Sequence, residues 1–265
     1  MGTADAFSEK IGDDTFSTLP ENLDGTRSIA MGGDMLIDLT VPMATGMPVY
    51  PGDPEVTIEP ALTVAAEGVN VLGLRLGSQS GTHVDAPYHI DDALPTLADL
   101  PLDRFAGPAV VADVRGLPPR APITPEALAP ALASAGSRPG TILLIATGWA
   151  EHWGDEHYLA HPWLTVEAAE RIVRSGTLTV GIDALSVDPT PAGEIPAHRV
   201  LCGAHAVIAE NLRNLDDLLA AQTAGHEIEV FLLPLRLGSA DGAPVRAVAR
   251  VTAEVTSGPR DRPGT

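Results

Sequence analysis

The side chains best suited to chemistry lie in one short run of the chain, from Gln79 to His89. Those able to bind a metal ion or move a proton are Gln79, His83, Asp85 and His89. If the backbone around Asp85 is extended, His83 and Asp85 project from the same face, because side chains alternate along a strand. Gly81 permits a backbone conformation that other residues avoid, and Pro87 stiffens the segment. The run therefore predicts a shaped loop or strand end that aims polar groups at one point.

The spacing of these groups leaves two interpretations open. Imidazole and carboxylate groups are the ligands that zinc and manganese bind, so the run could form part of a metal site. The same residues could instead form a hydrogen-bonded turn, because short patterns of histidine and aspartate recur by chance.

The run resembles the signature H-x-G-T-H-x-D-x-P-x-H of the cyclase family of metal-dependent hydrolases. That family includes bacterial kynurenine formamidase, isatin hydrolase and proteins named as polyketide cyclases. The chain matches the signature at Gly81, Thr82, His83, Asp85, Pro87 and His89. It departs at the first position, where Gln79 replaces the histidine. Further phrases resemble the same family, in the same order, between about residues 35 and 255.

The resemblance implies an architecture and a complete metal site. The implied fold is α/β, of the swivelling β/β/α type, with a central barrel-like mixed sheet and peripheral helices, in a homodimer or homotetramer. His198 and Glu210 would complete the site, because their spacing matches the second histidine and the glutamate of the kynurenine formamidase branch. From the residues alone, each would be a surface or half-buried side chain. A short helix followed by a returning strand could nevertheless bring the two together.

The resemblance also gives His89 a role, as a general acid/base. An imidazole with a pKa of about 6.5 suits proton transfer between water and a leaving group. The alternative is that His89 only orients Asp85. The amide of Gln79 is neutral and is a weaker ligand than imidazole, so we expect one zinc or manganese ion rather than a tight pair. The remaining alternative is that no metal binds and the pocket has been reused.

Three functions are compatible with this pattern. The first is hydrolysis of a small amide, formamide or lactone, in which metal-bound hydroxide attacks the carbonyl and His89 protonates the leaving group. The second is a ring-closing cyclase of secondary metabolism that acts on a poly-carbonyl substrate. The third is a non-catalytic binding protein on the same scaffold.

The composition of the chain argues against several other classes of protein. At 265 residues, 45% hydrophobic and 19% charged, the chain is long enough to bury a large core. A net charge of −19 argues against nucleic acid or an anionic membrane as a partner, and leaves a small-molecule substrate. The single cysteine, Cys202, excludes an internal disulfide and is expected to be buried packing. Without a signal-like start or a long apolar run, a soluble cytoplasmic protein is expected.

The elements that position these residues follow from apolar runs and their boundaries. We expect one domain over residues 34–257, preceded by a flexible arm over 1–33 and followed by a polar tail over 258–265. Expected strands lie near 35–40, 56–58, 71–76, 109–114, 141–146, 178–182, 206–209, 228–233 and 245–255, and expected helices near 124–136, 166–175, 195–201 and 212–221. Asp183 and Asp188 are expected to form turns and hydrogen bonds rather than to bind metal. His205 is expected to pack near the site or support it.

Overall fold

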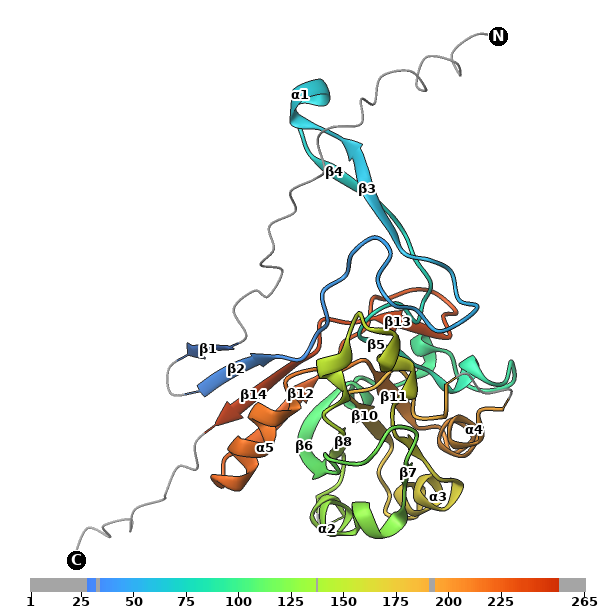
Figure 1. Ribbon diagram of the computed structural model, residues 1–265, viewed down its shortest axis with the longest axis vertical. Coiled ribbons are helices and arrows are strands. Elements are labelled where there is room, and N and C mark those ends of the chain that lie inside the picture. Colours follow the sequence, from blue (N-terminus) through green and yellow to red (C-terminus); the bar gives the residue numbers. More distant parts are fainter. Residues whose placement is uncertain (1–27, 32–33, 137, 191–193, 253–265) are drawn as a thin grey trace, which may run out of the picture.

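A ten-stranded mixed sheet runs through the computed structural model, which describes residues 28–31, 34–136, 138–190 and 194–252. The strands follow the order β1-β2-β14-β12-β6-β8-β10-β11-β5-β13 (Figure 1). Their bounds are β1 Ser28–Met31, β2 Asp34–Asp38, β5 His83–Asp85, β6 Ala106–Asp113, β8 Ile142–Ala146, β10 Thr179–Ile182, β11 Val207–Glu210, β12 Glu227–Phe231, β13 Gly242–Pro244 and β14 Val248–Thr252. The prediction of a mixed α/β fold with peripheral helices is confirmed.

Four strands at the centre, β6, β8, β10 and β11, are parallel. Parallel neighbours need crossover connections, and these contain the helices α2 Pro125–Ala135, α3 Val166–Arg174 and α4 Pro196–Gly203. Thr165 caps α3, because its side chain accepts a hydrogen bond from the Ala168 backbone. The minor strands β7 Pro122–Ile123 and β9 Trp163–Leu164 pair beside these connections. None of the helices in the described part of the chain is both long and apolar enough to span a bilayer.

The central strand β8 contributes to two hydrophobic cores. Ile142, Leu144 and Ala146 pack in a cluster with residues of β12, β14 and the helix α5, Leu215–Thr223. Leu143 and Ile145 belong to a second cluster under α2, α3 and α4. All five residues of β8 are buried, as the apolar run predicted. Side chains alternate along a strand, so one short run stabilises both sides of the sheet.

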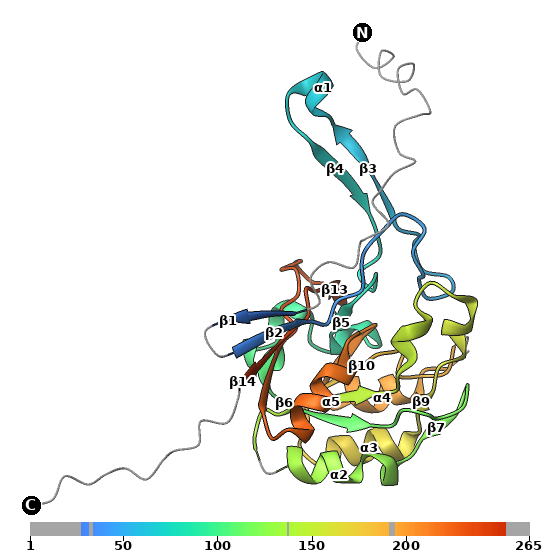
Figure 2. The same ribbon diagram turned by 60° about the vertical axis from the view of Figure 1, so that its left-hand side comes forward.

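A hairpin projects from the body of the molecule (Figures 1 and 2). It consists of β3 Thr57–Leu62 and β4 Val71–Arg75, with the single-turn helix α1 Val64–Glu67 between them. Both strands were predicted, and they pair with each other rather than with the main sheet. From the base of this hairpin arm the chain returns through residues 76–82 to β5 and then to the short helix η1, Pro87–His89.

Two boundaries differ from the predictions. Residues 28–31 form β1, which pairs with β2, although they fall in the expected N-terminal arm. The rest of that expected arm and the expected tail over 258–265 lie outside the described residues. Helix α5 begins at Leu215 rather than near Leu212. The reason is that the backbone N–H groups of Leu212 and Arg213 donate to Ile182 and Leu39, which ties this segment to the sheet.

Candidate metal centre and active site

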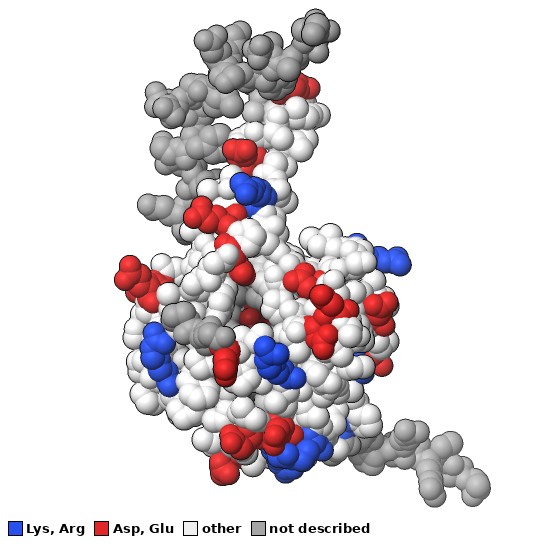
Figure 3. All heavy atoms as spheres, turned by 90° about the vertical axis from the view of Figure 1, so that its right-hand side faces the viewer, with Lys and Arg blue, Asp and Glu red and all other residues white. Residues whose placement is uncertain are grey.

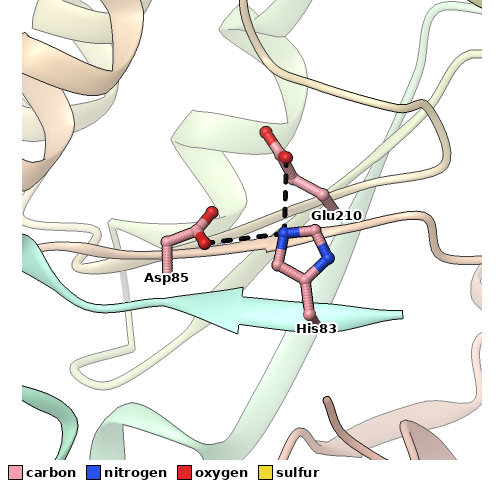
Figure 4. A group of neighbouring side chains, drawn as sticks. All are labelled: His83, Asp85 and Glu210. Atoms are coloured by element: carbon pink, nitrogen blue, oxygen red, sulfur yellow. Dashed lines mark ion pairs between the residues drawn. The ribbon is translucent and has the colours of Figure 1, made fainter. Parts of the chain in front are cut away.

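Two neighbouring antiparallel strands carry three of the predicted ligands. β5 places His83 and Asp85 on one face, and β11 pairs with β5 so that Glu210 lies opposite His83. The three side chains point toward one another (Figure 4). The Nε2 atom of His83 is 3.5 Å from Oδ1 of Asp85 and 3.6 Å from Oε2 of Glu210. One donor atom from each residue fits within 4.8 Å of the others.

His198 brings a fourth donor from α4. Its Nε2 atom lies 3.5 Å from Oε1 of Glu210 and 3.8 Å from Oδ2 of Asp85. The helix precedes β11 directly, so the chain returns His198 to the strand that carries Glu210. We refer to His83, Asp85, His198 and Glu210 as the four-residue cluster. All four residues are buried.

Both histidines of the cluster are oriented through Nδ1. The Nδ1 atom of His83 is 2.8 Å from the carbonyl oxygen of Gly81, and that of His198 is 2.7 Å from Oδ2 of Asp188. Both partners accept hydrogen bonds, so each Nδ1 carries a proton and each Nε2 faces the cluster, where it offers a lone pair once it is deprotonated. Asp188 is fixed in turn, because it accepts from the backbone N–H groups of Ala197 and His198. Gly81 adopts a positive φ of 65°, as its type predicted.

The cluster contains buried acceptors that nothing satisfies. Among the described residues, Nε2 of His83 and both carboxylate oxygens of Asp85 have no hydrogen-bond partner. Unpaired buried polar atoms are costly, and a cation at the centre would satisfy all three. The separations of 3.5–3.8 Å between donor atoms are close to the roughly 3.4 Å edge of a tetrahedral site with bonds of about 2.1 Å. The residues therefore fit a divalent ion.

Without a cation, the cluster favours bound protons. Burial raises the pKa of Glu210 to about 8. Burial alone would lower the pKa of His198, but its hydrogen bond with Asp188 and the nearby carboxylates of Asp85 and Glu210 raise it to about 10. Burial would raise the pKa of Asp85, but the nearby imidazoles of His83 and His198 lower it to about 2. A proton and a metal ion thus compete for one place.

A second group of polar side chains lies beside the cluster. The ring of His89, on η1, is 5.8 Å from that of His198, measured between centroids. Gln79 donates from Nε2 to Oδ2 of Asp241 at 2.9 Å, and its Oε1 accepts from the Ser78 hydroxyl at 2.7 Å. Both polar atoms of Gln79 are therefore engaged outside the four-residue cluster. Its role as a metal ligand stays a prediction.

Sequence reasoning missed two acidic residues of this site, Asp53 and Asp241. Asp53 is half-buried near His83 and His89; burial raises its pKa, against the lowering effect of their charges. Burial would raise the pKa of Asp241 as well, but hydrogen bonds, that from Gln79 foremost, lower it. Figure 3 shows a hollow in one face of the molecule below the hairpin arm, with acidic side chains around and inside it. Asp241 lies within residues 235–246, which resemble a closing phrase of the family, but its separation of 152 positions from His89 hid its place in the site.

The other candidates lie outside the cluster. Cys202 is buried, and burial raises the pKa of its thiol, which confirms a packing role. Asp183 accepts hydrogen bonds from Thr147 and Gly148, as expected of a hydrogen-bonding residue. The prediction for His205 is wrong: it is exposed in a turn with a φ of +62°, because the chain reverses there between α4 and β11.

Comparison with known sequences places the chain in a family. Residues 37–189 match the model of the family described as "Putative cyclase". The chain belongs to this family. It is 33% identical over 222 residues to kynurenine formamidase from Paracidovorax citrulli (strain AAC00-1), a match that covers 83% of this chain and 98% of that protein. The resemblance to the cyclase family is thereby confirmed.

Solved structures share the fold. The crystal structure of an isatin hydrolase bound to the product analogue thioisatinate matches with a TM-score of 0.74 at 24% identity, over 83% of this chain and 94% of that one. A protein described as a potential metal-dependent hydrolase with cyclase activity matches with a TM-score of 0.65 at 25% identity, over 82% and 98% of the two chains. The large mixed sheet is therefore an isatin hydrolase-like architecture.

Proposed function

We propose that the protein is a metal-dependent hydrolase that opens a small amide, formamide or lactone. The observation that carries this proposal is the buried four-residue cluster, in which lone pairs from two histidines and two carboxylates face one another. Such an arrangement is unfavourable without a cation. Membership of a family that contains kynurenine formamidases supports the hydrolase.

His83, Asp85, His198 and Glu210 would hold one zinc or manganese ion. When bound, such an ion lowers the pKa of a water molecule and polarises a carbonyl oxygen. Gln79 is a weaker candidate for a fifth ligand, because its amide is neutral and already hydrogen-bonded to Ser78 and Asp241. This favours one ion over a pair.

His89 would move the proton of the reaction. It lies next to the cluster and its side chain is 29% exposed, so a substrate can reach it. An imidazole there can take a proton from the attacking water and return it to the leaving nitrogen or oxygen. Its position outside the cluster separates this role from metal binding.

The test is hydrolysis of formanilide, an aryl formamide, by protein loaded with zinc or manganese. We expect aniline release, and a decrease in kcat of about 100-fold or more for His89→Ala with the metal content unchanged. His226→Ala, which removes an exposed histidine, serves as the control. No hydrolysis of formanilide or of a simple lactone with either metal would refute the hydrolase, and ring closure of a poly-carbonyl substrate would favour a cyclase.

We also infer that the chain forms a homodimer or homotetramer and that its sheet has the barrel-like form of swivelling β/β/α folds. The family resemblance supports both statements. The assembly has additional support from the hairpin arm. Within the described part of the chain its strands pair only with each other, and they expose Val71, Leu72 and Leu74. A two-stranded hairpin is marginally stable alone in water, so cover from another chain would stabilise it.

A further inference from the structure

We propose that Asp241 is a positioning residue that, held by Gln79, fixes the orientation and tautomer of His89. The Oδ2 atom of Asp241 lies 2.9 Å from Nε2 of Gln79 and 3.4 Å from Nδ1 of His89. This inference rests on the proposed function only for the consequence that His89 transfers a proton. The geometric assignment itself is independent of any reaction.

The backbone around Asp241 is fixed to the strand that carries the metal residues. Its carbonyl oxygen accepts from the Ala86 N–H at 2.8 Å. The next residue, Gly242, begins β13, which pairs with β5 so that Gly242 lies opposite Asp85. His89 is held to the same segment, because its own N–H donates to the carbonyl of Ala86. Asp241 and His89 therefore face each other from two rigidly connected positions.

Gln79 fixes the carboxylate. The Ser78 hydroxyl donates to Oε1 of Gln79, which turns the Nε2 amide group toward Asp241. An amide N–H can only donate, so it is a suitable partner for an ionised carboxylate. Nε2 of Gln79 is also 3.3 Å from Nδ1 of His89. With Nδ1 as a donor, as proposed, these two nitrogens approach the same Oδ2 atom of Asp241, and their own separation is a contact rather than a hydrogen bond.

The hydrogen bond with Asp241 sets the tautomer of His89. An ionised carboxylate only accepts hydrogen bonds, so Nδ1 of His89 carries the proton in its bond with Asp241. The Nε2 lone pair is then free to act as a base. Carboxylates orient catalytic histidines in the same way in unrelated hydrolases, where they also stabilise the imidazolium that forms. Gln79, which stands where the family signature has its first histidine, is thus assigned the role of holding Asp241 rather than of binding metal.

The direct experiment measures the histidine tautomers by ¹⁵N NMR of the metal-free and the zinc-loaded protein. His89→Gln identifies the His89 signals. We expect the Nδ1–H tautomer in the unsubstituted protein, a shift to the Nε2–H tautomer in Asp241→Asn, and retention of Nδ1–H in Asp241→Glu. Asp92→Asn, an exposed aspartate near His89 in sequence, should change nothing. An Nε2–H tautomer in the unsubstituted protein, or no change in Asp241→Asn, would overturn the proposal.

Kinetics separate this proposal from the proposed function. With formanilide, Asp241→Asn should lower kcat by about 100-fold, leave KM within about threefold and keep the bound zinc. Gln79→Met, of similar size, should give a smaller loss of kcat in the same direction. If the tautomer is as expected but the enzyme does not hydrolyse formanilide, the hydrolase fails and the assignment of Asp241 stands. If Asp241→Asn loses its zinc together with kcat, Asp241 supports the cluster and the positioning role fails.

Discussion

At the scale of single residues, the site depends on which nitrogen of each histidine carries a proton. Gly81 and Asp188 accept from the Nδ1 atoms of His83 and His198, so both Nε2 atoms turn inward. There they meet the carboxylates of Asp85 and Glu210. This direction of hydrogen bonding, more than the presence of histidine and carboxylate together, distinguishes a metal site from a hydrogen-bonded turn.

Metal affinity should increase with pH. In the metal-free protein burial raises the pKa of Glu210, and Asp188 with the other nearby carboxylates raises that of His198, so this pair holds at least one proton at neutral pH. A binding ion must displace that proton, so the logarithm of the affinity should rise by at least about one per pH unit below pH 8. Calorimetric titration with zinc in buffers of different ionisation enthalpy measures the protons released. Affinity that does not change between pH 6 and 8 would contradict the protonation assigned to the cluster.

The local part of the site could be predicted from the sequence, and the distant part could not. The period of two in a strand sufficed to place His83 and Asp85 on one face. The spacing of His198 and Glu210 was informative only through the family resemblance. Asp241 joins the site because β13 pairs with β5, and nothing in the residues around it indicates that pairing.

At the scale of the elements, the pairing of β5 with both β11 and β13 assembles the site. One neighbour supplies Glu210, and the other brings Asp241 beside His89. Gly242 makes the second pairing possible. A Cβ atom at that position would lie 2.6 Å from Nε2 of Gln79 and 2.8 Å from the Val84 carbonyl oxygen.

Gly242→Ala should therefore damage the site. The added methyl group must displace the Gln79 amide or open the pairing with β5, at a cost of about 1–3 kcal/mol in unfolding free energy. Zinc affinity should fall by about 10-fold or more, because the neighbours of the ligands move. Gly238→Ala is the matched control, since no atom of the described residues lies within 4 Å of its Cβ position. Chemical denaturation and zinc titration of the two variants check this. Equal stability and equal zinc affinity in the two variants would contradict the close packing of Gly242 against Gln79 and Val84.

The strands and helices themselves were largely predictable. The structure contains the strand predicted by the apolar run over β8 and the helix that begins after the cap at Thr165. Proline and glycine residues lie at the ends of several other elements. Their pairing was less predictable, because register depends on contacts between distant segments. The hairpin arm illustrates this: both of its strands were predicted, but their residues do not indicate that they pair with each other in a separate sheet.

At the scale of the whole molecule, the hairpin arm stands out because its apolar side chains do not pack against the body. Leu72 and Leu74 on β4 are 59% and 63% exposed, and the arm extends away from both cores (Figure 2). Exposed apolar side chains gathered on one projecting element are typical of an interaction surface. The proposed homo-oligomer provides a partner for it.

Replacing both leucines, Leu72→Asp and Leu74→Asp, should dissociate that oligomer. Two charges in a buried apolar contact are costly to desolvate, so we expect at least a 10-fold rise in the dissociation constant. Light scattering coupled to size-exclusion chromatography gives the mass of each form. Leu102→Asp, on the body and 75% exposed, is the control. A monomeric unsubstituted protein, or a doubly substituted protein of unchanged mass, would contradict the role of the arm.

The metal content of the purified protein tests the central claim most directly. Elemental analysis by plasma mass spectrometry, after incubation with zinc or manganese and removal of excess ion, should find about one equivalent per chain. Asp85→Asn and His83→Ala should lower it to less than about a tenth while the circular dichroism spectrum stays folded. His226→Ala should retain the full equivalent. An unsubstituted protein that binds neither metal, or cluster variants that bind as much as it does, would contradict the account.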